Sequence, residues 1–183
     1  MSIRMMSAIP ARVIQVLQDF LPAELDLIDA EEADGIVTPD IPTNPTCWHA
    51  WDRRLIVEFP AMSIRTAASS PLEVRPDTFG ARVNAIHRLD LMFHATLANA
   101  GTSPLTLQKL MHRYVSGAVR VLAVMKEGLQ TVGDPVRWGS PVELTLCEWV
   151  DDATYGPEVE QEGGAIVRTA TLPVRIQRVE ARS

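Results

Sequence analysis

The chain has 183 residues, of which 46% are hydrophobic and 22% charged, and its formal net charge is −6. These values are typical of one globular domain. They argue against a disordered chain and against a generic nucleic-acid-binding domain, which is usually basic. No run of 18 apolar residues occurs, so we expect no transmembrane helix and no membrane partner. Two cysteines are too few for a disulfide framework, which fits a chain made in a reducing cytoplasm.

Apolar residues at helical spacing predict a first helix over residues 10–21. Pro22 is expected to interrupt it, and one or two acidic turns then extend to residue 35. Three prolines in the next segment disfavour both a helix and a central strand. We therefore predict that residues 36–53 form an extended crossing loop.

The middle of the chain predicts two strands and a long helix. Residues 54–66 are apolar enough for a strand, and residues 67–80 are punctuated by Ser and Pro as in a long loop. Strict alternation over residues 87–97 predicts a strand with one wholly apolar face. Ser103 is a suitable cap for a helix over residues 104–125, which has a continuous apolar stripe and would span about 33 Å.

Two more strands are expected near the end of the chain, over residues 142–150 and 166–179. The connection between them, residues 151–164, is acidic and reads as a loop. The order of elements predicts an α+β fold. Its small mixed or antiparallel four-stranded sheet carries one long helix on its apolar face, together with an N-terminal helix.

We expect one domain over residues 1–183, with an N-terminal helical segment (1–35), the crossing loop (36–53), and the sheet with the long helix (54–183). The apolar stripes of the sheet and the long helix predict a common core. Its expected members are Leu91, Phe93, Leu110, Tyr114, Leu122, Leu172 and Val174.

Few motifs point to catalysis. His87-Arg88-Leu89-Asp90 resembles the HRLD segment of one class of RNA pseudouridine synthases, in which the Asp is the nucleophile, but the Thr-Ser-Gly turn of that motif is replaced by more strand. Cys47-Trp48-His49 offers two metal ligands, whereas a zinc site needs three or four. We therefore expect no catalytic site, no metal and no cofactor.

Several segments together form a family-like pattern. Phe59-Pro60-Ala61-Met62-Ser63-Ile64 places an aromatic–proline step at the entry to the sheet. The strand at residues 87–97 runs through Asn99-Ala100-Gly101 into the helix at residues 105–125, which has Tyr114 in its middle. Tyr155-Gly156-Pro157, Gly163-Gly164 and residues 167–179 complete the pattern. In order and spacing, these segments resemble the tail terminator (tail completion) proteins of long-tailed bacteriophages.

This resemblance implies a homo-oligomeric ring, commonly a hexamer, at the head-proximal end of the phage tail. Such a ring stops tail-tube polymerisation and joins the tail to the head. Its partners are the tail tube protein and a head-side connector or neck protein, and DNA passes through it without specific binding. The protein would be assembled in the bacterial cytoplasm and reside in the virion. Residues 67–80 and 151–162 depart from the family pattern, which leaves another neck protein as an alternative. A small cytosolic ligand-binding or enzymatic domain is the alternative from a different class.

Charge is divided unevenly near the C-terminus, where an acidic block is followed at once by a basic one. A closed ring joins two different patches of one subunit, and complementary charge would set their register. We expect Arg168, Arg175 and Arg178 to form the basic patch, with the acidic end of the N-terminal helix as one candidate partner. Pairing within the chain is the alternative.

The acidic loop at residues 151–162 has two candidate roles in such a ring: it could line the central channel, or it could contact a head-side partner. Solvation of the subunit is the simpler alternative. The candidate residues are Asp151, Asp152, Glu158, Glu160 and Glu162.

Overall fold

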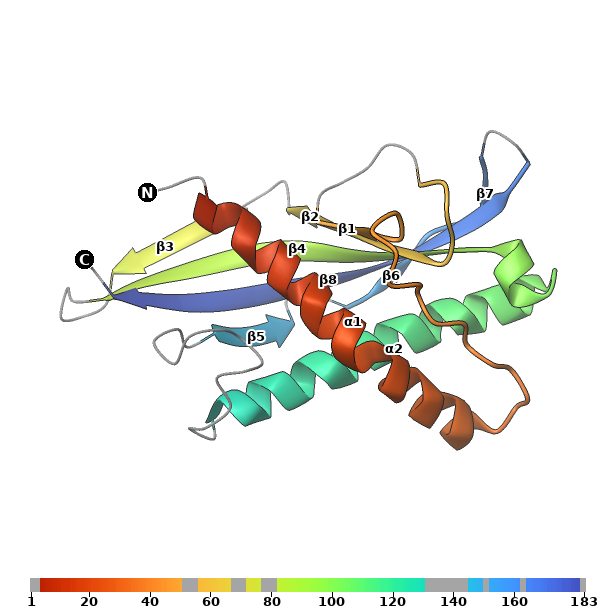
Figure 1. The fold of residues 1–183 in the computed structure, drawn as a ribbon, viewed down its shortest axis with the longest axis horizontal. Coiled ribbons are helices and arrows are strands. Elements are labelled where there is room, and N and C mark those ends of the chain that lie inside the picture. Colours follow the sequence, from red (N-terminus) through yellow and green to blue (C-terminus); the bar gives the residue numbers. More distant parts are fainter. Residues whose placement is uncertain are drawn as a thin grey trace.

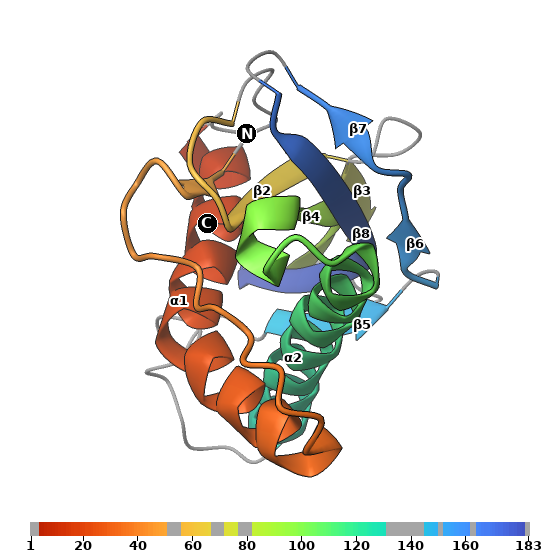
Figure 2. The ribbon, with the colours of Figure 1, turned by 90° about the vertical axis from the view of Figure 1, so that its right-hand side faces the viewer.

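The computed structural model describes residues 4–50, 56–66, 72–76, 82–130, 145–149, 152–161 and 164–181. Two long helices, α1 (Arg4–Glu32) and α2 (Pro104–Gln130), lie on one side of a mixed sheet, as Figure 1 and Figure 2 show. The predicted α+β class is confirmed.

Helix α1 is a single helix of 29 residues, and the predicted break at Pro22 is wrong. A proline inside a helix removes one backbone hydrogen bond. Apolar side chains before and after the proline, including Leu17, Leu21, Leu25 and Ile28, are nevertheless all buried. Their packing outweighs the lost hydrogen bond, so the helix continues to the acidic residues at its end.

Two long antiparallel strands, β4 (Arg82–Thr96) and β8 (Ile166–Ala181), form the centre of the sheet. Their register is continuous from the pair Arg82 and Ala181 to the pair Thr96 and Val167, with no bulge. Alternate residues of each strand are therefore sorted strictly between the two sheet faces. One face is buried under the helices, with Leu89, Leu91, Phe93 and Ala95 of β4 at 1% exposure or less.

Shorter strands flank this pair, so the sheet has eight strands among the described residues rather than the predicted four. Beside β4 lie β2 (Ala61–Thr66) and β3 (Leu72–Pro76), and β1 (Trp48–His49) pairs with β2 in parallel. Beside β8 lie β5 (Thr145–Trp149), β6 (Thr154–Tyr155) and β7 (Val159–Glu160). The four predicted strands all exist, and the added strands are β1, β3, β6 and β7.

The added strands correct three loop predictions. Part of the expected loop 67–80 is β3, and part of the acidic connection 151–164 is β6 and β7. The crossing segment has no regular structure over residues 35–42, as expected, but it ends in β1. These strands have two to five residues each, so they lack the period that a sequence pattern needs and take their register from a long neighbour.

The connection from β4 into α2 uses well-defined capping. Thr96 and Asn99 form a reciprocal capping box on the short 3-10 helix η1 (Leu97–Ala100), and Gly101 ends it in the left-handed conformation at φ 59°. Ser103 then caps α2 by accepting a hydrogen bond from the Thr106 amide, 3.3 Å away. The predicted start of the long helix is confirmed.

All seven predicted core residues are buried to 3% exposure or less, which confirms the predicted packing of the long helix on the sheet. The Phe93 ring from β4 stacks on the Tyr114 ring from α2, with centroids 6.1 Å apart. Burial of each large apolar side chain contributes about 1.5–3 kcal/mol, so this contact stabilises the layered arrangement.

Gly117 allows the two helices to approach closely. A Cβ at this position would lie 2.8 Å from Leu21 Cδ1 and 3.2 Å from Leu25 Cδ2 of α1. We expect Gly117→Ala to lower the free energy of unfolding by about 1 kcal/mol, because overpacking costs more than the helix propensity gained. Urea unfolding measures the change, and Ser116→Ala on the exposed side of α2 is the matched control. A more stable Gly117→Ala variant would contradict the close contact.

Candidate functional site

The arginines of β8 do not form one patch. Arg168 and Arg175 are seven residues apart on a strand without a bulge, so their side chains leave opposite faces of the sheet. Arg175 lies opposite Arg88 of β4 and opposite Glu148 of β5 in register. Arg178 pairs through its backbone with the positions of Ala85 and Thr145, and its side chain lies outside the described part. The expected patch is corrected, because strand alternation separates residues an odd number apart.

Arg168 contacts the acidic segment of its own chain. Its guanidinium Nη1 lies 3.9 Å from Glu158 Oε1, and its Nε donates a hydrogen bond to the Gly156 carbonyl at 3.2 Å. The Arg168 side chain is only 17% exposed. Arg168 therefore pairs within its own chain, which was the alternative to a contact with another subunit.

The acidic segment is attached to the body of the molecule. Strands β6 and β7 pair with β8, and the Tyr155 ring lies 4.1 Å from the ring of His112 on α2. Asp152, Glu158 and Glu160 are exposed on this segment. Asp151 and Glu162 of the predicted set lie outside the described residues.

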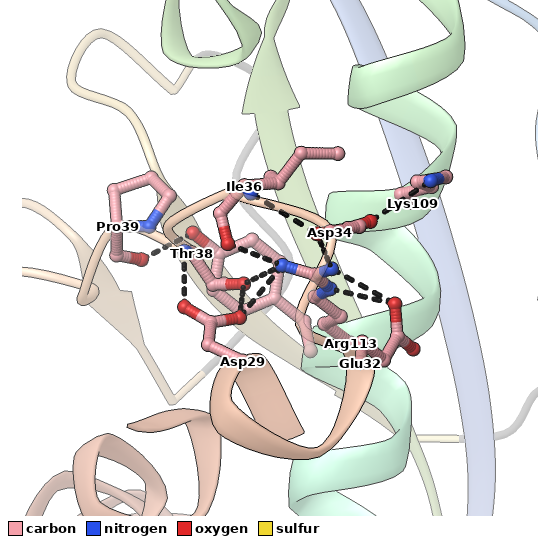
Figure 3. A network of polar contacts seen from close by, with 9 residues as sticks. Asp29, Glu32, Asp34, Ile36, Thr38, Pro39, Lys109 and Arg113 are labelled. Carbon is pink, nitrogen blue, oxygen red and sulfur yellow. Dashed lines mark hydrogen bonds and ion pairs between the residues drawn. The ribbon is translucent and has the colours of Figure 1, made fainter. Parts of the chain in front are cut away.

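The acidic end of α1 surrounds a buried arginine of α2. The Arg113 side chain is 1% exposed, and its guanidinium nitrogens lie 2.7 Å from Asp29, 2.8 Å from Glu32 and 2.7 Å from Asp34, as Figure 3 shows. We call these four residues the Arg113 clasp. Burial alone disfavours the cation, but the hydrogen bonds to Asp34 and Glu32 raise the pKa of Arg113 overall.

The Arg113 clasp also holds the crossing segment. Arg113 Nη1 donates to the Ile36 carbonyl at 2.8 Å, and the Thr38 amide and hydroxyl both donate to Asp29 at 2.6 Å. The Tyr114 hydroxyl, next along α2, donates to the Pro39 carbonyl. Polar groups buried by these contacts are all hydrogen-bonded, so α1, the crossing segment and α2 form one unit.

Two more cations of α2 pair with this acidic end. Lys109 Nζ lies 2.8 Å from Asp34, and Arg120 Nη2 lies 2.6 Å from Glu31. Hydrogen bonds from Lys109 and Arg113 hold the pKa of Asp34 well below its usual range. Within the described residues, α2 of the same chain therefore pairs with this acidic end, and the expectation that it meets an arginine of another subunit stays a prediction.

The tetrapeptide at residues 87–90 lies within β4, as the strand pattern predicts. Its Asp90 forms an ion pair with Arg65 of β2 at 3.1 Å. Cys47, Trp48 and His49 are buried, and burial together with a hydrogen bond to Glu58 raises the pKa of the Cys47 thiol. Among the described residues, no three His, Cys, Asp or Glu side chains gather in a way that could hold a metal ion.

A buried histidine links three strands on the side of the sheet away from the helices. His94 Nε2 lies 2.9 Å from the Ser63 hydroxyl of β2, and its Nδ1 lies 2.9 Å from the Thr169 hydroxyl of β8. A serine beside a histidine is the start of a nucleophilic site. Ser63 is only 1% exposed, however, so this pair contributes to the packing of the sheet. Sequence reasoning missed it because the three residues lie on separate strands.

Burial, with a smaller effect of His49, lowers the pKa of His94 to about 4. Above pH 6.5 the imidazole is neutral in both states, and its full contribution to stability is present. As the pH falls towards 4, the unfolded chain gains a proton that the folded chain does not, so about 3 kcal/mol is lost. We expect the stability difference between wild type and His94→Gln to shrink by this amount between pH 7 and pH 4. Urea unfolding at both pH values checks it, and a constant difference would contradict a neutral buried His94.

No helix in the described residues combines the length and the apolar character needed to cross a bilayer. No protein-family model matches this chain, and no curated protein sequence matches it.

Proposed function

We propose that this chain is a structural virion protein that forms a ring at the head-proximal end of a phage tail. There it stops tube polymerisation and joins the tail to the head. The observation that carries the proposal is the order of elements: a long helix, a crossing segment, the strands β1 to β4, a short capped turn into a second long helix, and the strands β5 to β8. This order supports the resemblance to tail terminator proteins.

In this proposal the protein acts by assembly into a homohexameric ring, the size that the resemblance implies, and it uses no cofactor. Its partners are further copies of itself, the tail tube protein and a head-side connector, and it is assembled in the bacterial cytoplasm. Strands β3, β6 and β7 are additions in the two segments that depart from the family pattern, and they favour the alternative of another neck protein.

The mass of the purified protein and negative-stain images, with and without isolated tails, test the proposal. A terminator forms rings that cap tube ends. Rings that bind connectors but never tube ends would favour the neck alternative. A chain that stays monomeric and leaves tubes uncapped would contradict both, and binding of a metabolite by that monomer would favour the enzymatic or ligand-binding alternative.

In the ring, the acidic segment would line the channel or face the head-side partner. A negative wall would repel phosphates, so DNA would pass without binding, whereas a basic wall would bind it by counterion release. Glu158 already pairs with Arg168, so the exposed Asp152 and Glu160 are the better probes of this idea.

We expect particles carrying Asp152→Lys and Glu160→Lys to assemble normally and to eject DNA more slowly. The kinetics of DNA ejection measure the effect. Normal ejection kinetics would contradict the idea that the acidic segment lines the channel. Failed head joining would instead indicate that the segment contacts the head-side partner.

A further inference from the structure

The crossing segment between α1 and β1 is fixed in place on both sides of one residue. The Ile36 amide donates to Asp34 at 3.0 Å, and the Ile36 carbonyl accepts from Arg113 at 2.8 Å. The Thr38 amide and hydroxyl both donate to Asp29 at 2.6 Å, as Figure 3 shows. Asp29 and Asp34 in turn pair with Arg113, so both positions are attached to one buried guanidinium.

Val37 lies between these two fixed residues and projects into the solvent. It is 80% exposed, whereas Thr38 beside it is 5% exposed, and no other large apolar residue in the described part of the chain is as exposed. Single exposed apolar residues are common on protein surfaces. Val37 differs because its backbone is held on both sides before any partner binds. A side chain held in this way loses little conformational entropy when a contact forms.

The stretch that carries Val37 is acidic even after its ion pairs are counted. Residues 26–40 contain six acids and no Lys or Arg. These acids pair with three cations of α2: Lys109, Arg113 and Arg120. Six acids and three cations leave an excess of three negative charges. Burial, followed by the charges of Asp26 and Asp29, raises the pKa of Asp40, which agrees with an uncompensated negative field.

A second copy of this chain does not offer the matching charge on its described surface. Every Lys and Arg whose side chain the structure describes already has a partner: Arg65, Arg88, Lys109, Arg113, Arg120, Arg168 and Arg175. The occupant that fits this surface is therefore a different protein, with Lys or Arg side chains around a small apolar pocket.

We propose that Val37 is the anchor of a contact with another protein of the particle, which holds Val37 in an apolar pocket bordered by Lys and Arg. The Arg113 clasp positions this anchor. The inference rests on the proposed function, because the partner is a component of the tail or of the head. Asp26 and Asp40 are exposed and would face the cations of the partner, as charged groups do at the polar rim of an interface.

Replacing Val37 with aspartate tests the anchor. The residue is exposed, so we expect Val37→Asp to fold and to form rings of wild-type mass. Capping of isolated tails and joining to isolated heads are each titrated with the protein. We expect the concentration needed for one of these steps to rise at least about tenfold, because a charge replaces the apolar anchor. Val57→Asp is the matched control, since it changes another valine, 65% exposed, outside the crossing segment.

Replacing Asp40 with lysine tests the charge of the partner. This change removes the repulsion of Asp40 by Asp26 and Asp29, so thermal unfolding should show no loss of stability. We expect the same step to need more protein at low salt, and the difference from wild type to shrink as salt screens the charges. Asp40→Lys also decides the matter if Val37→Asp folds poorly. A variant that caps or joins as well as wild type at low salt would contradict a basic partner.

The outcomes separate this contact from the function on which it rests. Val37→Asp rings that cap tails and join heads like wild type would overturn the anchor and leave the terminator proposal standing. Loss of ring mass in folded Val37→Asp would make a second copy the occupant, which overturns a contact with a different protein. Wild-type protein that forms no ring and caps no tail would overturn both.

Discussion

Replacing Arg113 with alanine should lower the free energy of unfolding by about 3–5 kcal/mol, because it removes one partner of a buried ionic cluster. The guanidinium lies within 2.8 Å of three carboxylates, and none of its nitrogens is without a hydrogen bond. Without it, Asp29, Glu32 and Asp34 repel one another. Urea unfolding at neutral pH measures the loss.

Arg120→Ala is the matched control for Arg113→Ala. Both arginines lie on α2 and pair with acids at the end of α1, but the Arg120 side chain is 39% exposed and that of Arg113 is 1% exposed. An exposed pair contributes less than about 1 kcal/mol. Equal small losses for the two variants would contradict the view that the Arg113 clasp joins α1, the crossing segment and α2.

Truncation of Phe93 should also cost about 3–5 kcal/mol, because the ring is fully buried between the sheet and α2 and leaves a cavity when removed. Met92 is the neighbouring residue and points to the opposite, half-exposed face. We expect Met92→Ala to cost about 1 kcal/mol, a typical value for a single substitution. Thermal unfolding compares the two, and an unchanged melting temperature for Phe93→Ala would rule out the packing of α2 on this strand.

The parts of the fold that the sequence predicts have a long and regular pattern. Alternation from Leu89 to Ala95 identifies both the central strand and its buried face, and the apolar stripe of α2 identifies the side that packs on it. Ser103 and Pro104 locate the start of that helix within the chain. Such patterns are local, so they need no knowledge of distant residues.

The features that the sequence did not predict depend on contacts between distant segments. Arg113 and Asp29 are 84 positions apart, and no pattern of nearby residues indicates that they meet. Pro22 argues for a break when α1 is considered alone, and only burial of the residues around it explains its continuity. The separation of Arg168 from Arg175 is different, because counting the odd interval along a predicted strand would have placed them on opposite faces.

The unbroken register of β4 and β8 limits how the length of this chain can vary. One residue inserted near the middle of either strand would exchange the two faces for the rest of that strand, and would bring Arg175 or Arg88 beneath the helices. Two inserted residues would restore the faces but shift each following residue past its partner. Changes in length are therefore tolerable in the connections and at the outer ends of β4 and β8, and the length of this central pair sets the length of the whole sheet.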